Sequence, residues 1–161
     1  MAAQRTLVLV RHAKSDWSNA VPDDERPLAE RGRRDAPAIG RWLVEHVERV
    51  DLVVCSPAKR ARQTWELASA SLEPAPPVRP DERIYTAGPG ELLGVVDELP
   101  DEAGTVVLVG HNPSLTDLVA LLCGEAHELK TSAVAVLCWT GSWPDVHARS
   151  ARLDATALAR G

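Results

Sequence analysis

Short runs dominated by branched aliphatic residues recur along the chain, and longer amphipathic stretches separate them. The clearest runs are 6–10, 51–55, 105–109 and 131–139. A continuous apolar run is typical of a strand that is buried on both faces, as in a parallel sheet. We therefore expect a strand at each of these four places.

The stretches between the runs place apolar residues three and four positions apart, which predicts amphipathic helices. The expected helices are 27–47, 57–72, 89–99 and 113–124. Pro57 and Pro113 stand where two of these helices begin, and proline suits the first helical position. Ser56 and Asn112 precede these prolines and are expected to act as N-caps.

The remaining segments are shorter. The proline-rich stretch 73–77 is interpreted as a stiff linker within the domain, and 78–85 and 150–156 as edge strands. Strands that alternate with helices are typical of a parallel sheet covered on both faces. We expect one domain over residues 1–161 with an α/β fold, a three-layer α/β/α sandwich around a mostly parallel central sheet.

Composition narrows the function classes. Of the 161 residues, 25% are charged and 45% hydrophobic, as in ordinary globular proteins. The net charge of -5 argues against a general nucleic-acid binder, so an anion site has to be a local basic cluster. No apolar run approaches the roughly 20 residues of a membrane span, and no secretory leader is recognisable. Cys55, Cys123 and Cys138 lack CxxC spacing, so we expect reduced thiols in a cytoplasmic protein.

Basic side chains follow three of the predicted strands. Arg11 and His12 come directly after the first run, Arg60 lies in the first turns of the helix after the second, and His111 closely follows the third. Each could be an ordinary surface residue on its own. The carboxyl ends of parallel strands meet at one edge of a sheet, so we expect all four side chains to lie together. Two arginines and two histidines in one pocket suit a phosphoryl group.

Three motifs carry a resemblance to a known family. They are Leu-Val-Arg-His-Ala-Lys-Ser at 9–15, Cys-Ser-Pro-Ala-Lys-Arg-Ala-Arg-Gln-Thr at 55–64 and Val-Gly-His-Asn-Pro-Ser at 109–114. In order and spacing they resemble the histidine phosphatase superfamily, also called phosphoglycerate mutase-like, across nearly the whole chain. The compact size is similar to that of the SixA-type phosphohistidine phosphatases. The resemblance implies a phosphoglycerate mutase-like fold.

The resemblance also implies roles for the basic residues. His12 would be the nucleophile that is transiently phosphorylated, and Arg11, Arg60 and His111 would complete the phosphate pocket. A neutral imidazole has a lone pair for attack on phosphorus, and its other nitrogen has to be held as N–H, as a backbone carbonyl could do. The arginines, and a protonated His111, would neutralise the phosphoryl oxygens. We expect no cofactor and no metal ion.

Four positions depart from, or extend, the family pattern. Ala13 replaces the usual glycine, and Ser18 stands where mutases have asparagine; we assign Ser18 to substrate binding. Asn112 follows His111, where the acid phosphatase branch has an acid. Glu82 lies in a stretch similar to the mutase Glu-Arg-x-Tyr, which makes it a candidate general acid; the alternative is a solvated loop carboxylate.

The sequence thus predicts a metal-independent phosphatase with a phosphohistidine intermediate that acts on phosphohistidine in proteins. The residues leave two alternatives open, a small-molecule phosphomonoesterase of the same superfamily and a phosphate-binding module without turnover. The expected partner is a phosphorylated protein or a small phosphorylated substrate, with no nucleic acid and no membrane. A pocket without a clear acid is also expected to favour P–N over unactivated P–O bonds.

Overall fold

The computed structural model describes residues 3–86, 88–146 and 149–161. Its strands are β1 (Gln4–Arg11), β2 (Leu52–Cys55), β3 (Val78–Pro80), β4 (Thr105–Gly110), β5 (Ala133–Thr140) and β6 (Arg152–Leu158). They form one sheet in the order β3-β2-β4-β1-β5-β6. The first four strands of that order are parallel to one another, β5 runs antiparallel to β1, and β6 runs antiparallel to β5. The predicted mostly parallel sheet is therefore confirmed.

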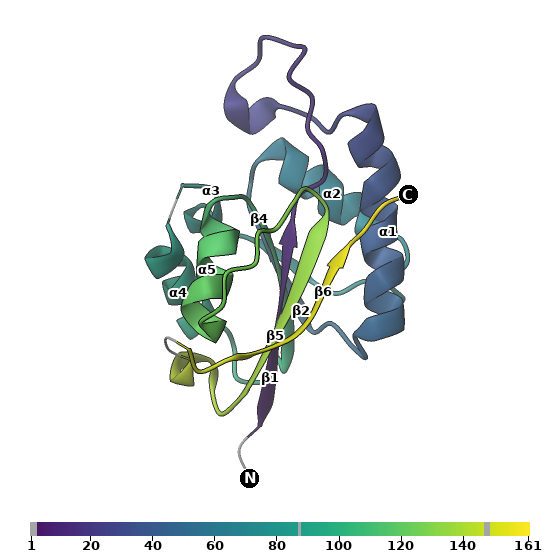
Figure 1. Cartoon of the computed structure of the whole chain (residues 1–161). Helices are drawn as coiled ribbons and strands as arrows, with labels where there is room; N and C mark the ends of the chain where they lie inside the picture. Colours follow the sequence, from purple (N-terminus) through teal and green to yellow (C-terminus); the bar gives the residue numbers. More distant parts are fainter. Residues whose placement is uncertain (1–2, 87, 147–148) are drawn as a thin grey trace.

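Helices cover both faces of the sheet, which gives the three expected layers (Figure 1). The helices are α1 (Glu30–His46), α2 (Lys59–Ser69), α3 (Arg83–Thr86), α4 (Pro89–Asp97) and α5 (Ser114–Cys123), with short 3-10 turns η1 (Asp23–Glu25) and η2 (Trp143–Asp145). α1 and α2 lie on one face, and α3, α4 and α5 lie on the other. None of the helices in the described ranges has the length and apolarity needed to cross a membrane.

The central strand β1 explains why the sheet is buried on both faces. Leu7 and Leu9 pack in the core beneath α4 and α5, while Val8 and Val10 pack in the core beneath α1 and α2. All four side chains are fully buried. A continuous apolar run is what a strand between two helical layers requires.

The second helix begins later than its sequence predicts. Ser56 and Pro57 were expected to start it, but α2 begins at Lys59 and Ala58 takes the N-cap position without a side-chain cap. Ser56 still belongs to the sheet, because its N–H donates to the Val109 carbonyl oxygen at 3.0 Å. Its hydroxyl accepts from the Ala58 N–H at 3.2 Å and also reaches the site described below.

The expected edge strand over 78–85 is wrong in its second half. Only Val78–Pro80 pairs with β2. The Asp81 carboxylate then accepts a hydrogen bond from the Arg83 N–H at 3.0 Å, which turns the chain into the short helix α3. This turn decides the position of Tyr85, which the site uses. Smaller shifts occur elsewhere: α2 ends at Ser69, and α5 begins one residue after Pro113.

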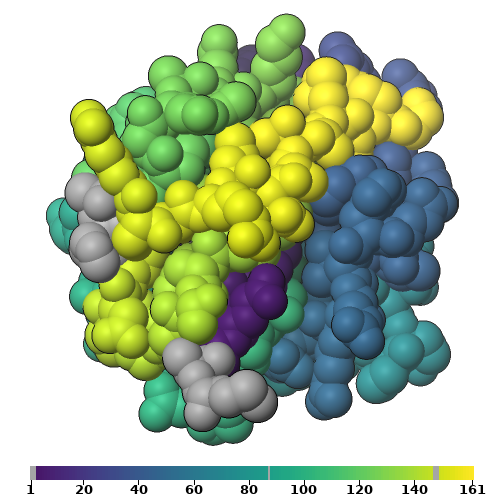
Figure 2. All heavy atoms as spheres, turned by 60° about the horizontal axis from the view of Figure 1, so that its bottom comes forward, coloured from purple at the N-terminus to yellow at the C-terminus, as the bar shows by residue number. Residues whose placement is uncertain are grey.

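Glycines bring α1 close to its neighbours. A Cβ at Gly40 would lie 1.9 Å from the Ala68 carbonyl oxygen of α2, and one at Gly32 would lie 2.1 Å from the Lys14 carbonyl oxygen. The C-terminal segment, yellow in Figure 2, lies against the blue α1, where the Gly161 N–H donates to the Asp35 carboxylate at 3.0 Å. α1 therefore supports the segment that follows β1.

Candidate active site

A cavity of about 230 Å³ lies where β1 and β4 leave the sheet. All four residues predicted to bind phosphate line it, namely Arg11, His12, Arg60 and His111. The remaining lining residues are Lys14, Ser15, Trp17, Arg26, Asn112 and Thr131. The parallel register pairs Arg11 with Gly110, so the two histidines that follow leave the sheet side by side. Their ring centroids are 5.1 Å apart.

A larger cavity, of about 660 Å³, lies far from this chemistry. It is formed around Val47, Asp51 and the linker 73–77, before β2 begins. None of the predicted site residues lines it. The smaller cavity at the carboxyl end of the strands is therefore the candidate active site.

His12 is oriented for nucleophilic attack. It is only 7% exposed, and its Nδ1 lies 2.7 Å from the Ala13 carbonyl oxygen. A carbonyl oxygen only accepts, so Nδ1 carries the proton and Nε2 keeps its lone pair. Burial lowers the pKa of His12 to about 3, which keeps the imidazole neutral at physiological pH. The Thr64 hydroxyl accepts from the Ala13 N–H at 3.0 Å and fixes this backbone in turn.

Three buried nitrogen atoms of residues that line this cavity have no hydrogen-bond partner among the described residues. They are Nε of Arg11, Nε of Arg60 and the Nδ1 atom of His111. Arg11 Nη1 donates to the Leu129 carbonyl oxygen at 3.0 Å, and both Nη atoms of Arg60 donate to Asp23. Unpaired buried polar groups are rare, so these three atoms indicate where an anion would be held.

Ser56 is the hydrogen-bond partner of the His111 ring. Its hydroxyl accepts from the Ala58 N–H at 3.2 Å and lies 2.7 Å from His111 Nε2. When the hydroxyl donates to Nε2, Nδ1 carries the proton and becomes a donor towards the cavity. Burial, together with the nearby Arg60, lowers the pKa of His111 to about 4. A neutral His111 can therefore supply the donor that the sequence assigned to its protonated form.

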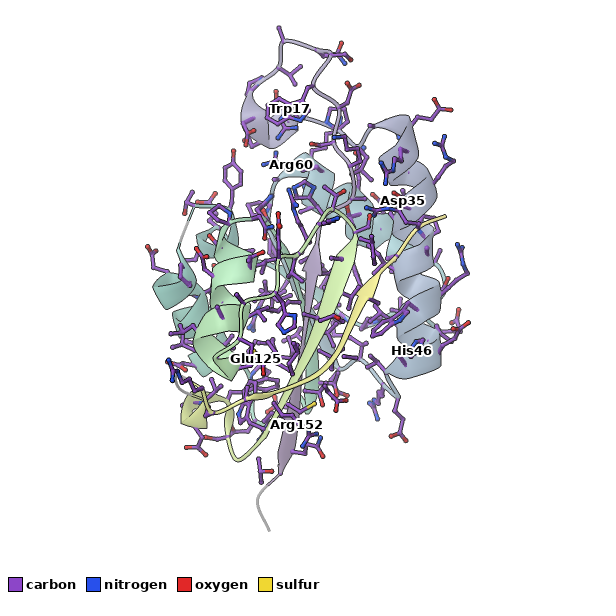
Figure 3. The ribbon with its side chains drawn as sticks, in the orientation of Figure 1. Trp17, Asp35, His46, Arg60, Glu125 and Arg152 are labelled. Atoms are coloured by element: carbon purple, nitrogen blue, oxygen red, sulfur yellow. The ribbon has the colours of Figure 1, made fainter. Side chains whose placement is uncertain are left out.

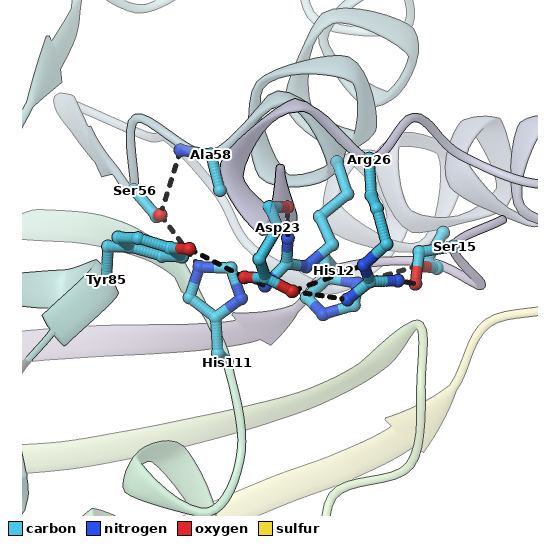
Figure 4. A network of polar contacts seen from close by, with 10 residues as sticks. His12, Ser15, Asp23, Arg26, Ser56, Ala58, Tyr85 and His111 are labelled. Carbon is cyan, nitrogen blue, oxygen red and sulfur yellow. Dashed lines mark hydrogen bonds and ion pairs between the residues drawn. The ribbon is translucent and has the colours of Figure 1, made fainter. Parts of the chain in front are cut away.

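Asp23 is the site residue that the sequence analysis missed. Its carboxylate accepts hydrogen bonds from Tyr85 Oη at 2.6 Å and Arg60 Nη2 at 3.0 Å, and from Arg26 at 3.1 and 3.2 Å (Figure 4). Its backbone carbonyl oxygen accepts from Arg60 Nη1 at 2.7 Å. The bond from Tyr85, aided by those from the arginines, lowers the pKa of Asp23 to about 2. Asp23 thus holds both Nη atoms of Arg60 and leaves Nε directed elsewhere.

The structure does not bring Glu82 or Ser18 into the cavity. Glu82 is exposed, and Tyr85, three residues later, reaches the site instead, with its ring edge-on to His111 at 5.5 Å. Ser18 is also exposed and bonds to the Asp16 carboxylate at 2.6 Å. The acidic run at 23–25 could have indicated a carboxylate near the cavity. It could not show which of its three residues contacts Arg60.

The segment 15–28, called the 15–28 loop below, stands over the cavity at the top of Figure 3. Its base is closed by the antiparallel bridge between Ser15 and Leu28 and by the Asp16 N–H, which donates to the Pro27 carbonyl oxygen at 2.9 Å. Its far part is tied to Arg60 through Asp23. The loop is therefore held both at its base and at its far part.

Comparison with protein-family models assigns the chain. Residues 7–103 match the model of the histidine phosphatase superfamily, branch 1. The chain belongs to this superfamily. It is accordingly a phosphatase, and the cavity described above is its candidate catalytic centre.

Relatives and solved structures agree with the assignment. An uncharacterized protein of Mycobacterium tuberculosis is 37% identical over 155 residues, which cover 89% of this chain and 96% of that protein. The structure of a candidate phosphohistidine phosphatase SixA from Nakamurella multipartitia is 34% identical, with a TM-score of 0.87 over 98% of both chains. A counterpart from Agrobacterium tumefaciens is 26% identical, with a TM-score of 0.82 over 95% of this chain and 97% of that one. This histidine phosphatase thus has the phosphoglycerate mutase-like fold of the SixA type.

Among the residues that the structure describes, no group of three or more His, Cys, Asp or Glu side chains is placed to share a metal ion. The expectation of a metal-independent reaction stays a prediction.

The two buried histidines predict a pH-dependent stability of this phosphatase. Their pKa values of about 3 and about 4 lie below the ordinary value of about 6.5. Between these values the unfolded chain binds protons that the folded chain excludes. The free energy of unfolding is therefore fully developed above pH 6.5 and falls as the pH drops towards 4, by up to about 1.4 kcal/mol per pH unit for each histidine.

Urea denaturation at pH 7.5, 6.5, 5.5 and 4.5 measures this effect. We expect His12→Asn to make the decline shallower, while His46→Gln, at an exposed position on α1, leaves the slope unchanged. An unchanged slope in His12→Asn would contradict the burial of a neutral His12.

Proposed function

We propose that this histidine phosphatase hydrolyses phosphohistidine in proteins, with His12 as the nucleophile and without a metal ion. The observation that carries the proposal is the set of three unpartnered donors, on Arg11, Arg60 and His111, around the cavity that His12 lines. Three donors can each bind one non-bridging oxygen of a phosphoryl group. Donors that are already oriented need no rearrangement when charge develops in the transition state.

The reaction would proceed in two displacements at phosphorus. In the first, the lone pair on His12 Nε2 forms the new P–N bond while the substrate's bond to phosphorus breaks and its electron pair leaves with the leaving group. In the second, a water oxygen attacks the phosphorus and gives up a proton to solvent, the P–N bond breaks with its electron pair returning to His12 Nε2, and inorganic phosphate departs. The Ala13 carbonyl oxygen keeps the proton on Nδ1, so the attacking nitrogen is the same in every cycle.

The absence of an acid at the cavity supports the choice of substrate. Within the described ranges, no Asp or Glu lines it, and the nearby Asp23 is ionised, with a pKa of about 2. Phosphohistidine expels an imidazole whose conjugate acid has a pKa of about 6.5, whereas serine or sugar phosphates must expel a much more basic alkoxide. A site without a proton donor therefore favours the P–N bond.

Substrate profiling of the purified protein tests the proposal. We expect phosphohistidine peptide and activated aryl phosphates to be hydrolysed well and alkyl or sugar phosphates poorly. EDTA should leave the rates unchanged, and vanadate should inhibit because it resembles the five-coordinate transition state.

Each alternative has its own signature in this assay. Efficient hydrolysis of a sugar phosphate, with phosphohistidine untouched, would identify a small-molecule phosphomonoesterase. Phosphate binding with no turnover of any substrate would identify a binding module. Loss of activity on chelation would reveal a metal site.

A further inference from the structure

We infer that Trp17, with Arg26 behind it, is a stacking platform for a flat aromatic leaving group attached directly to phosphorus. The inference rests on the proposed reaction at His12 and extends it to the part of the substrate that departs. Trp17 lines the same cavity as His12 and Arg60, and Figure 3 places it on the loop above Arg60.

The exposure of Trp17 calls for a partner. The residue is 72% exposed, more than any other exposed large hydrophobic residue of the described chain. Tryptophan carries the largest apolar surface of all side chains and gains stability when that surface is covered. The tryptophans at 65, 139 and 143 are buried and Trp42 is partly buried, so high exposure is particular to the tryptophan at the active site.

The indole ring is held in place from one side. The Arg26 guanidinium carbon lies 3.5 Å from the centre of the Trp17 ring, which is a close cation–π contact. Arg26 is itself only 6% exposed and donates to the Ser15 hydroxyl at 2.5 Å and to Asp23. One face of the indole therefore rests on a fixed support, and the high exposure of the ring leaves the other face open.

A fixed aromatic face beside a phosphate pocket selects by the shape of the leaving group. Because Trp17 and His12 line the same cavity, a ring bonded directly to phosphorus, such as the imidazole of phosphohistidine or the phenol of phosphotyrosine, would stack on such a face. The flexible aliphatic carbon of phosphoserine has no flat surface to offer. The absence of an acid at the cavity favours the imidazole of the two rings.

The test compares substrates that differ in the ring. We would measure kcat and KM for phosphohistidine peptide and for phosphoramidate, which has a P–N bond and no ring. For Trp17→Leu we expect KM for phosphohistidine peptide to rise about five- to tenfold, while kcat and all constants for phosphoramidate stay within about twofold. Trp17→Phe, which keeps an aromatic ring, should have a KM for phosphohistidine peptide close to that of the wild type.

Two controls separate stacking from damage to the pocket. Val21→Ala removes another exposed apolar side chain of the 15–28 loop and should change neither substrate. Inhibition by inorganic phosphate, which has no ring, should be the same in Trp17→Leu and the wild type. An equal loss for both substrates, or no loss for phosphohistidine, would overturn the platform.

Phosphotyrosine and phosphoserine peptides distinguish the sources of the ring. A loss in Trp17→Leu confined to phosphotyrosine peptide would overturn the imidazole assignment and identify a phenol. Failure of the proposed function looks different, because the wild type would then release phosphate from neither P–N substrate. In that case the effect of Trp17→Leu on phosphotyrosine peptide, compared with its effect on phosphoserine peptide, tests the stacking platform.

Discussion

We expect His12→Ala to abolish turnover of every phosphorylated substrate while the protein stays folded. Without the imidazole no phosphorylated intermediate can form, and a pocket of donors alone can only bind phosphate. Mixing wild-type protein with substrate labelled on phosphorus and quenching rapidly should trap label on the protein that is stable to base and labile to acid. His12→Ala should trap none, and thermal denaturation should give a transition as cooperative as that of the wild type.

His46→Ala is the matched control. This histidine is exposed on α1, where it stacks on Trp42 at 4.3 Å, and it lines no part of the active-site cavity. It should keep both the label and the rate. Label found on a cysteine or on Asp23 would refute a histidine nucleophile.

We expect Arg60→Ala to reduce kcat/KM by about 10²–10³-fold, or ~3–4 kcal/mol. The change removes the unpartnered Nε donor, and it also leaves the Asp23 carboxylate without Arg60 at the edge of a phosphate site. Steady-state kinetics with phosphohistidine peptide measures the loss. The control is Arg62→Ala, at an exposed position two residues after Arg60 on α2. It should change kcat/KM by less than about twofold.

A double variant separates the two causes. Removing Asp23 in Arg60→Ala abolishes the stranded negative charge, so Arg60→Ala/Asp23→Ala should be more active than Arg60→Ala alone. Asp23→Ala by itself should be less active than the wild type, because Arg60 loses the carboxylate that holds its Nη atoms. Additive losses in the double variant would show that Asp23 and Arg60 act independently.

The positions of His12, Arg60 and His111 could be predicted because each follows a strand whose apolar run is unmistakable. Parallel strands bring their carboxyl ends together, so topology alone converts three distant segments into one cavity. The position of Ser56 shows the limit of local rules. Its type and the proline after it indicated an N-cap. Its backbone N–H instead bonds to β4, α2 begins three residues later, and its hydroxyl contacts the His111 ring as well as the Ala58 N–H.

Asp23 and Tyr85 could not be predicted, because neither the 15–28 loop nor a helix as short as α3 carries a periodic signal. The polar pattern of 15–26 indicated a loop and nothing about its path across the cavity. In the stretch around α3, Glu82 was the more reactive residue type and attracted the assignment. The Asp81 turn places Tyr85 at the site and leaves Glu82 exposed, and the Asp81 carboxylate holds this turn by accepting from the backbone and the side chain of Arg83.

The residues that would contact the leaving group and the residues that would react with phosphorus lie on different parts of the fold. His12, His111 and the donors of the pocket are supplied by the sheet and by α2, whereas Trp17 and Arg26 are supplied by the loop. The bridge between Ser15 and Leu28 closes the base of the loop, so a different loop can be carried above it. Asp23, which holds the Nη atoms of Arg60, is a contact between the loop and the pocket that such a change has to preserve. A graft of a different loop between these two residues could therefore redirect the enzyme to new leaving groups, provided that it keeps one carboxylate facing Arg60.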